Sequence, residues 1–226
     1  VPRVRPRPKC ARRVRYRKQY SEFLAPRGYT AARLPAGTAA TMQKKPPLTL
    51  QPTTLWDYPS QYYGTAMQGD KTYQGATPSY IIWNLLQRFT KKNDLVVDPM
   101  CGSGTTLDVA RDLGRRALGY DIAPYRKDIF RSDARSLPLE TEKADFVFVD
   151  PPYSTHLQYS DDPACIGKLD ARDPAYYRAM EGVIGEIARV LRPHRCMALY
   201  CSRAFTKGKR VERIWRQEAL KVPKRH

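Results

Sequence analysis

Residues 95–106 read LVVDPMCGSGTT. The apolar run at 95–97 predicts a short buried strand, and the stretch from about 105 to 113 predicts a helix. Between the two, Gly102 and Gly104 let the backbone come close to a ligand at the carboxyl end of a strand, where α/β sheets bind nucleotide-like molecules. A tight turn with a purely structural role is the alternative interpretation.

Helical and strand patterns alternate on both sides of this turn. Thr77-Pro78-Ser79 opens a helix whose apolar residues share one helical face. Asp173 and Pro174 predict another helix, as its N-cap and its first residue. The alternation predicts an α/β fold with a doubly wound, mostly parallel sheet. The predicted strands are 95–97, 117–120, 146–149 and 196–200.

An acidic residue follows the glycine turn at the distance expected for a ribose contact. Asp121 ends the strand predicted at 117–120 and can accept hydrogen bonds from ribose hydroxyls. The third glycine of the dinucleotide motif is missing, because Leu107 stands at its position, and no Gly-Lys-Ser or Gly-Lys-Thr phosphate loop occurs. The turn therefore favours an adenosyl ligand without a pyrophosphate, and S-adenosylmethionine fits best.

Asp150-Pro151-Pro152-Tyr153 follows the strand predicted at 146–149. The two prolines stiffen the turn and, having no N–H, leave its carbonyls as acceptors. The Asp150 carboxylate and the Pro151 carbonyl can hold an amino group, and the Tyr153 ring offers a face for a planar base. This arrangement favours chemistry at an exocyclic amine, whose lone pair is aimed at an electrophilic methyl group. An ordinary Asp-Pro turn is the alternative.

Together, the glycine turn after Asp98 and the Asp-Pro-Pro-Tyr tetrapeptide resemble the amino-group DNA methyltransferases, which form N6-methyladenine or N4-methylcytosine. The resemblance covers roughly residues 55–202. It implies a Rossmann-like class I methyltransferase fold, S-adenosylmethionine as cofactor and DNA as partner. The implied catalytic residues are Asp150, Pro151, Pro152 and Tyr153. The implied cofactor-binding residues are Thr77, Pro78, Asp98, Met100, Cys101, Gly102, Gly104, Thr105, Thr106, Asp121, Ile122, Asp133 and Ala134.

The chain departs from this family pattern at its C-terminal end. The family's sheet has seven strands and ends in an antiparallel pair, whereas residues 202–226 are short and contain a charged stretch that predicts a helix at 211–220. We therefore expect a fold that is C-terminally truncated. Two alternatives stay open: an RNA amino (guanine-N2 type) methyltransferase, and a truncated, non-catalytic remnant that binds cofactor or nucleic acid.

The formal charge of +18 is concentrated at the two ends. Residues 1–41 hold 11 Lys+Arg and one acid, and residues 203–226 hold 9 Lys+Arg and two acids. We predict a basic, disordered arm at 1–41 with short helical possibilities around 11–24, a methyltransferase domain at 42–202 and a basic tail at 203–226. Basic ends can contact a phosphate backbone. Because Met42 precedes the first folded-looking stretch, an upstream extension without a role is the alternative for the arm.

The remaining patterns exclude several classes. No apolar run is long enough to span a bilayer, and no secretory pattern opens the chain. The five cysteines form no CxxC pair, which favours reduced thiols in a cytoplasmic protein. His156, His194 and His226 are scattered, so we expect no metal site. The polar segment 154–162 is a candidate to close over a target base.

Overall fold

The computed structural model consists of two units, Val1–Ser60 and Gln61–His226. In the first unit, β1 (Arg15–Tyr16) pairs in parallel with β2 (Leu55–Trp56). At Arg15–Tyr16, the short helical possibility around 11–24 is wrong, because these residues pair as a strand; the rest of that stretch lies outside the described residues. The structure describes residues 48–50, 61–70, 72–153, 155 and 157–201, and the short strands at 15–16, 55–56, 205–206 and 209–210.

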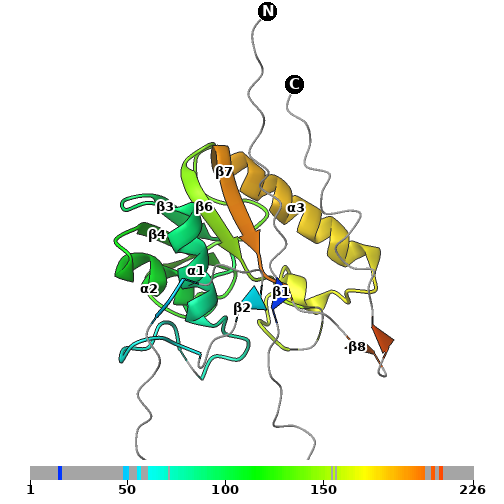
Figure 1. The fold of residues 1–226 in the computed structure, drawn as a ribbon. Coiled ribbons are helices and arrows are strands. Elements are labelled where there is room, and N and C mark those ends of the chain that lie inside the picture. The colour runs from blue at the N-terminus through cyan, green and yellow to red at the C-terminus, as the bar shows by residue number, and fades with distance from the viewer. Residues whose placement is uncertain are drawn as a thin grey trace, which may run out of the picture. The chain divides into compact units, whose positions relative to one another are not determined.

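The second unit is built on a five-stranded parallel sheet with the strand order β5-β4-β3-β6-β7 (Figure 1). The chain runs outward from β3 to β5, returns to β6 on the other side of β3, and continues to β7. This order confirms the predicted doubly wound α/β sheet, and its topological switch point lies between β3 and β6. The strands are β3 (Leu95–Asp98), β4 (Arg116–Asp121), β5 (Ile129–Arg131), β6 (Ala144–Val149) and β7 (Leu191–Leu199).

Helices cover both faces of this sheet. Val97 and Val147 share a buried cluster with Val183 of the long helix α3, whereas the Phe146 ring stacks on Phe89 of α1 at 6.2 Å. Successive residues of a strand point to opposite faces, so α3 and α1 cover different faces. Strands buried on both sides need continuous apolar runs, which explains the apolar stretches 95–97 of β3 and 146–149 of β6. The helices are α1 (Ser79–Phe89), α2 (Thr105–Asp112), α3 (Pro174–Val190) and the 3-10 turn η2 (Ile166–Lys168).

The helix boundaries follow local chemistry. Asp173 caps α3, since its side chain accepts a hydrogen bond from the backbone N–H of Ala175, and Pro174 is the first helical residue, as predicted. The connections from β4 to β5 and from β5 to β6 contain no helix, although doubly wound folds commonly have one there. Among the described residues, no helix combines the length and the apolar character needed to cross a bilayer.

The C-terminal end differs from the seven-stranded pattern. β8 (Phe205–Thr206) and β9 (Lys209–Arg210) form an antiparallel pair that is separate from the five-stranded sheet. The antiparallel pair that closes the sheet in the resembling family is thus not part of the sheet in the described portion of this chain. The helix predicted at 211–220 lies outside the described residues.

Candidate active site

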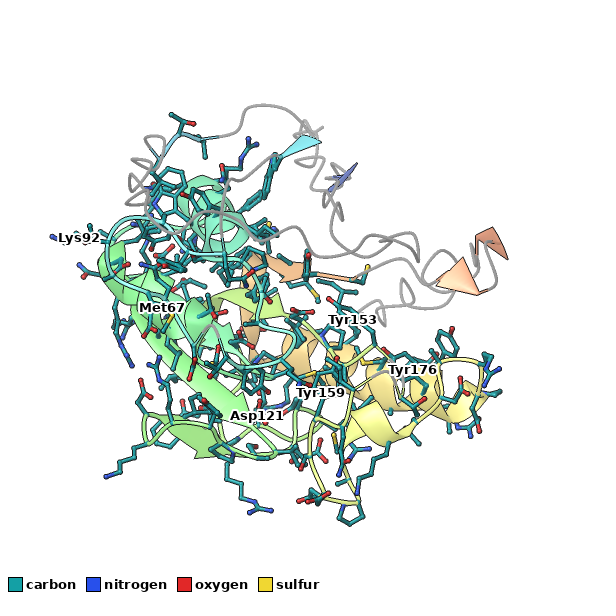
Figure 2. All side chains as sticks on the ribbon, turned by 90° about the horizontal axis from the view of Figure 1, so that it is seen from below. Met67, Lys92, Asp121, Tyr153, Tyr159 and Tyr176 are labelled. Atoms are coloured by element: carbon teal, nitrogen blue, oxygen red, sulfur yellow. The ribbon has the colours of Figure 1, made fainter. Side chains whose placement is uncertain are left out.

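A cleft opens at the carboxyl edge of the sheet, around the switch point. Asp98 ends β3, Asp121 ends β4, Asp133 follows β5 and Asp150 follows β6, and all four line the cleft. Parallel strands end at the same edge, which is why segments far apart in sequence meet here. The cleft has an empty volume of about 920 Å³, which includes space open to solvent. In Figure 2, Asp121, Tyr153 and Tyr159 lie in the central part of the molecule and Lys92 at its edge.

All the predicted site residues line this cleft except two, Pro78 and Gly104. Those two stand at the N-caps of α1 and α2. The four residues of the tetrapeptide and the glycine turn therefore face one common space, although the roles assigned to them stay predictions.

The glycine turn needs glycine for two separate reasons. Gly102 and Gly104 have φ angles of +49° and +84°, a region that other residues seldom adopt. In addition, a Cβ atom on Gly102 would lie 3.0 Å from the Tyr73 ring, and one on Gly104 would lie 2.8 Å from the guanidinium carbon of Arg126. The turn is thus enclosed between a tyrosine ring and an arginine.

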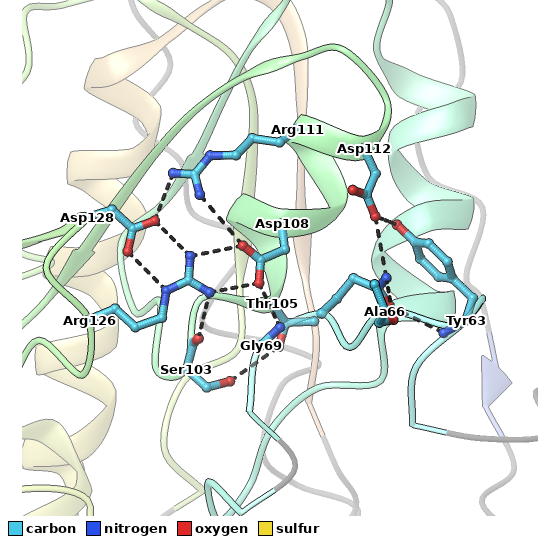
Figure 3. A network of polar contacts seen from close by, with 11 residues as sticks. Tyr63, Ala66, Gly69, Ser103, Thr105, Asp108, Arg111, Asp112, Arg126 and Asp128 are labelled. Carbon is cyan, nitrogen blue, oxygen red and sulfur yellow. Dashed lines mark hydrogen bonds and ion pairs between the residues drawn. The ribbon is translucent and has the colours of Figure 1, made fainter.

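A charged network fixes the arginine beside the turn (Figure 3). The Arg126 guanidinium donates to both oxygens of Asp108, at 2.7 and 2.9 Å, and to both oxygens of Asp128, at 3.0 and 2.7 Å. Arg111 forms an ion pair with Asp128 at 2.8 Å. The bonds from Arg126 lower the pKa of Asp128. Bidentate pairs of this kind hold the first turn of α2 to the loop after β4.

The loop before α1 is fastened to the same helix. The backbone N–H of Gly69 donates to Asp108 at 2.8 Å, and the Tyr63 hydroxyl donates to Asp112 at 2.8 Å. Both contacts are drawn in Figure 3. The sequence reading missed this network, and the only signal for it was the i, i+3 spacing of Asp108 and Arg111.

Asp98 and Asp121 hold the turn from within. The Asp98 carboxylate accepts from the Met100 N–H at 3.0 Å and from the Thr106 hydroxyl at 2.6 Å, and its burial raises its pKa to about 7. The Asp121 carboxylate accepts from the Gly102 N–H at 2.9 Å, and burial raises its pKa as well. Burial removes these carboxyl groups from water, and the donors that bond them are uncharged. The ionised form is therefore penalised, which raises the pKa.

Both carboxylate oxygens of Asp150 accept hydrogen bonds from hydroxyl groups. The Thr77 hydroxyl donates to Oδ2 and the Tyr153 hydroxyl donates to Oδ1. Burial raises the pKa of Asp150 to about 7, and the two hydrogen bonds act in the lowering direction. The Pro152 carbonyl accepts from the Tyr176 hydroxyl at 2.8 Å, which ties the tetrapeptide to α3. The sequence predicted a ring face for Tyr153 but not its hydroxyl bond to Asp150.

Several further residues line the cleft that the sequence reading did not select. Tyr73 comes from the loop before α1, while Tyr159 and Cys165 come from the segment after the tetrapeptide. A Cβ atom on Gly75 would lie 3.7 Å from Tyr159, so the two segments meet. Tyr159 and Ser160 belong to the stretch expected to close over a base, whereas His156 lies outside the described residues. The presence of a tyrosine within this polar segment could have indicated from the sequence that Tyr159 lines the cleft.

The strand order and the glycine turn after β3 define the class of protein. A doubly wound parallel sheet with a nucleotide-type turn at the switch point is the Rossmann-like fold of class I methyltransferases. Residues 9–132, more than half of the chain, match the N6/N4 methyltransferase family model, which is described as DNA methylase. The chain belongs to this family, whose methyl donor is S-adenosylmethionine, and the predicted family is thus confirmed. The tetrapeptide at 150–153 lies beyond the matched residues, and its role stays a prediction.

Individual relatives match shorter stretches. The type II methyltransferase M2.DpnII of Streptococcus pneumoniae is 37% identical over 65 residues, which cover 29% of this chain and 23% of the relative. A tRNA (guanine(10)-N2)-dimethyltransferase of Methanothermobacter thermautotrophicus is 37% identical over 79 residues, covering 28% and 23%. The matches span between 11% and 32% of the length of the curated relatives. The match to the structure of TrmN from Thermus thermophilus covers 56% of this chain and 39% of the TrmN chain, at 20% identity and a TM-score of 0.42. The fold assignment rests on the strand order and not on this match.

The charge of the cleft fits the cofactor of the family. Among the described residues that line it, four are aspartates and none is a lysine or arginine. S-adenosylmethionine carries a sulfonium, an amino group and one carboxylate, so it is a net cation that such a lining attracts, whereas a pyrophosphate is an anion that it disfavours. The residues present therefore suit S-adenosylmethionine better than a dinucleotide.

Proposed function

We propose that this protein transfers the methyl group of S-adenosylmethionine to the exocyclic amino group of a DNA base, N6 of adenine or N4 of cytosine. One observation carries the proposal: the glycine turn after β3 and the tetrapeptide after β6 open into the same cleft at the switch point. A cofactor turn and an amine-binding turn on adjacent strands suit a reaction in which a methyl group passes between two bound molecules.

S-adenosylmethionine supplies, when bound, an electrophilic methyl group attached to a positive sulfur. The turn from Asp98 to Thr106 would hold its methionine part, and Asp121 would accept from the ribose hydroxyls. Asp133 and Ala134, with Ile122, would flank the adenine. The anionic lining of the cleft and the close backbone approach at Gly102 support this assignment.

The tetrapeptide would orient the target amine. Asp150 accepts one N–H and the Pro151 carbonyl accepts the other, so that the nitrogen lone pair faces the methyl group. The Tyr153 ring stacks on the base, which must leave the helix at a cost of a few kcal/mol. A carboxyl group with a pKa near 7 can also take up the proton that the amine gives up, and burial raises the pKa of Asp150 to about 7.

An RNA base is the second candidate substrate. The supporting observation is the match to a tRNA (guanine(10)-N2)-dimethyltransferase over 28% of this chain, since that relative methylates an exocyclic amine of RNA by name. Two acceptors and a stacking ring serve an amino group on either nucleic acid equally well.

The test is methyl transfer from radiolabelled S-adenosylmethionine to unmethylated DNA and to unmodified RNA, with nucleoside analysis of the product. We expect label in N6-methyladenine or N4-methylcytosine from DNA, and none with Asp150→Ala. Label in N2-methylguanosine from RNA would replace the first candidate by the second. Cofactor binding without transfer to any nucleic acid would favour the non-catalytic remnant.

A further inference from the structure

We propose that Thr77 is the positioning residue of Asp150: its hydroxyl holds one carboxylate oxygen and thereby directs the other oxygen toward the target amine. This inference rests on the proposed function, because the proposed function is what places a target amine at Asp150. It assigns to Thr77 a task at the tetrapeptide, besides the cofactor contact that the family resemblance implies.

The contact joins two elements that are far apart in the chain. Thr77 Oγ1 donates to Asp150 Oδ2 across 73 residues of sequence, and the Thr77 side chain is only 8% exposed. A hydrogen bond to a buried carboxylate is charge-assisted and directional. With Oδ2 held in this way, rotation of the carboxyl group is blocked and the direction of Oδ1 is set.

The backbone on both sides of Thr77 is itself anchored. The Gln61 side-chain amide donates to the Ala76 carbonyl at 2.5 Å, and the Ser79 N–H donates to the Gln61 carbonyl at 2.9 Å. Pro78, between Thr77 and α1, has a φ of −60°, which its ring enforces. A hydroxyl on such a fixed segment is a suitable reference point for a catalytic carboxylate.

The second hydroxyl on Asp150 cannot serve in the same way. The Tyr153 hydroxyl, which bonds Oδ1, belongs to the side chain whose ring is proposed to stack on the base. Its position would therefore depend on the base itself. Thr77 contacts Asp150 from a different element and needs no substrate to do so.

The surroundings of Asp150 make the contact measurable. The titratable groups that face it in the described part of the chain are Asp98 of β3, Tyr153, Tyr159, Tyr176 of α3 and Cys201, and none of these is a cation. Hydrogen bonds from Thr77 and Tyr153 thus favour the ionised carboxylate against a burial that raises the pKa of Asp150 to about 7. Loss of the Thr77 hydroxyl would raise this pKa further.

The experiment compares Thr77→Val, which removes the hydroxyl at nearly constant shape, with Thr77→Ser, which keeps it. Thr90→Val is the matched control, because Thr90 lies at the other end of α1, is 7% exposed and, among the described residues, bonds only Leu86 and Arg115. Carbon-13 NMR of the full chain follows the Asp150 carboxyl, assigned through Asp150→Asn. We expect Thr77→Val to raise the pKa of Asp150 by about one pH unit, and Thr77→Ser and Thr90→Val to leave it nearly unchanged.

Methylation rates give the second readout. Single-turnover transfer by Thr77→Val should be more than about tenfold slower than wild type near pH 6.5, where a smaller fraction of Asp150 is ionised. It should stay slower near pH 9, where the carboxyl is ionised in both proteins but Thr77 no longer holds it, so equal rates at pH 9 would remove the positioning role. An Asp150 titration that does not move in folded Thr77→Val overturns the inference, as does an equal effect from Thr90→Val. If Thr77→Val does not fold, Thr77→Ala is measured in the same way.

The two proposals fail differently. If the enzyme is active and Thr77→Val leaves the pKa of Asp150 unchanged, this inference alone is removed. A titration that responds to Thr77, in a protein that binds cofactor and methylates no base, removes the proposed function and leaves the Thr77–Asp150 contact standing.

Discussion

Asp98 and Asp150 are buried against hydroxyl and backbone donors, and no cation in the described part of the chain hydrogen-bonds to either. Burial raises the pKa of each to about 7, far above the value of a carboxyl group in water. Each group therefore changes charge near neutral pH. At the scale of the residue, this makes both the binding of a cationic ligand and the turnover sensitive to pH.

Affinity for S-adenosylmethionine should rise as the pH increases from about 6 to about 8. A positive sulfonium favours an ionised carboxylate, so binding it releases protons from Asp98 in the cofactor turn, whose pKa burial raises to about 7. S-adenosylhomocysteine, whose sulfur is neutral, is the matched ligand and should show a weaker dependence. Calorimetry in two buffers of different ionisation enthalpy counts the protons, and equal pH dependence for both ligands would contradict the expectation.

Asp150→Ala should reduce methyl transfer at least about 100-fold while changing cofactor affinity little. The variant loses an acceptor that orients the amine, and small misplacements of a reacting group cost about that much in rate. Glu140→Ala is the control, because Glu140 is 79% exposed and pairs only with Lys143 among the described ion pairs. Single-turnover assays with saturating cofactor measure the rate; wild-type activity in Asp150→Ala would exclude the assigned role.

At the scale of the element, α2 depends on the network around Arg126 as well as on its own sequence. The helix begins at an N-cap glycine that makes no side-chain cap bond. Its first turn is held by the pairs that Asp108 forms with Arg126 and with the Gly69 N–H. Tertiary contacts thus anchor the start of this helix, which has no side-chain cap.

Gly104→Ala should therefore lower the free energy of unfolding by at least about 1–2 kcal/mol, because alanine resists a φ of +84° and its Cβ would meet a guanidinium that Asp108 and Asp128 hold in place. Gly185→Ala is the control. Gly185 is exposed within α3 and an added Cβ meets nothing within 4 Å, so this variant should gain up to about 1 kcal/mol. Urea denaturation distinguishes the two, and equal effects would contradict the prediction.

At the scale of the whole molecule, the buried carboxyl groups set how stability varies with pH. Asp98 and Asp150 have a higher pKa in the folded chain, about 7, than in the unfolded one, where it is about 3.9. Between these values the folded state binds more protons, so the stability that they contribute is present below about pH 4 and is lost as the pH rises through 7. Ion-paired Asp128, Asp133 and Glu186 have lowered pKa values, and their contribution is lost as the pH falls below about 4.

The free energy of unfolding should accordingly be highest near about pH 4 and lower at about pH 8. Asp150→Asn should flatten the decline between these two values, since the amide does not titrate. Denaturation midpoints at several pH values test this. A wild type that is more stable at about pH 8 than at about pH 4 would show that other groups dominate.

Local chemistry was enough to predict much of the fold and part of the candidate site. The apolar run before Asp98 predicted β3, the glycines predicted the turn, and Asp173 with Pro174 predicted the start of α3; the structure confirms all three. Each prediction depends on a property of a few neighbouring residues, such as hydrophobic period, a positive φ or a cap. The order of such elements predicted the class of sheet, because crossover connections admit few topologies.

Contacts between distant segments were decided only in the tertiary structure. The sequence indicated neither the Thr77 hydroxyl on Asp150 nor the Tyr73 ring over Gly102, and it did not indicate the strand pairing at Arg15. Periodicity and turn chemistry report on residues within a few positions of one another, whereas these partners are brought together by the packing of whole elements. The sequence thus determined which groups the cleft could use, and the fold determined which of them touch, because contact depends on position in space and position in the chain predicts it only at short range.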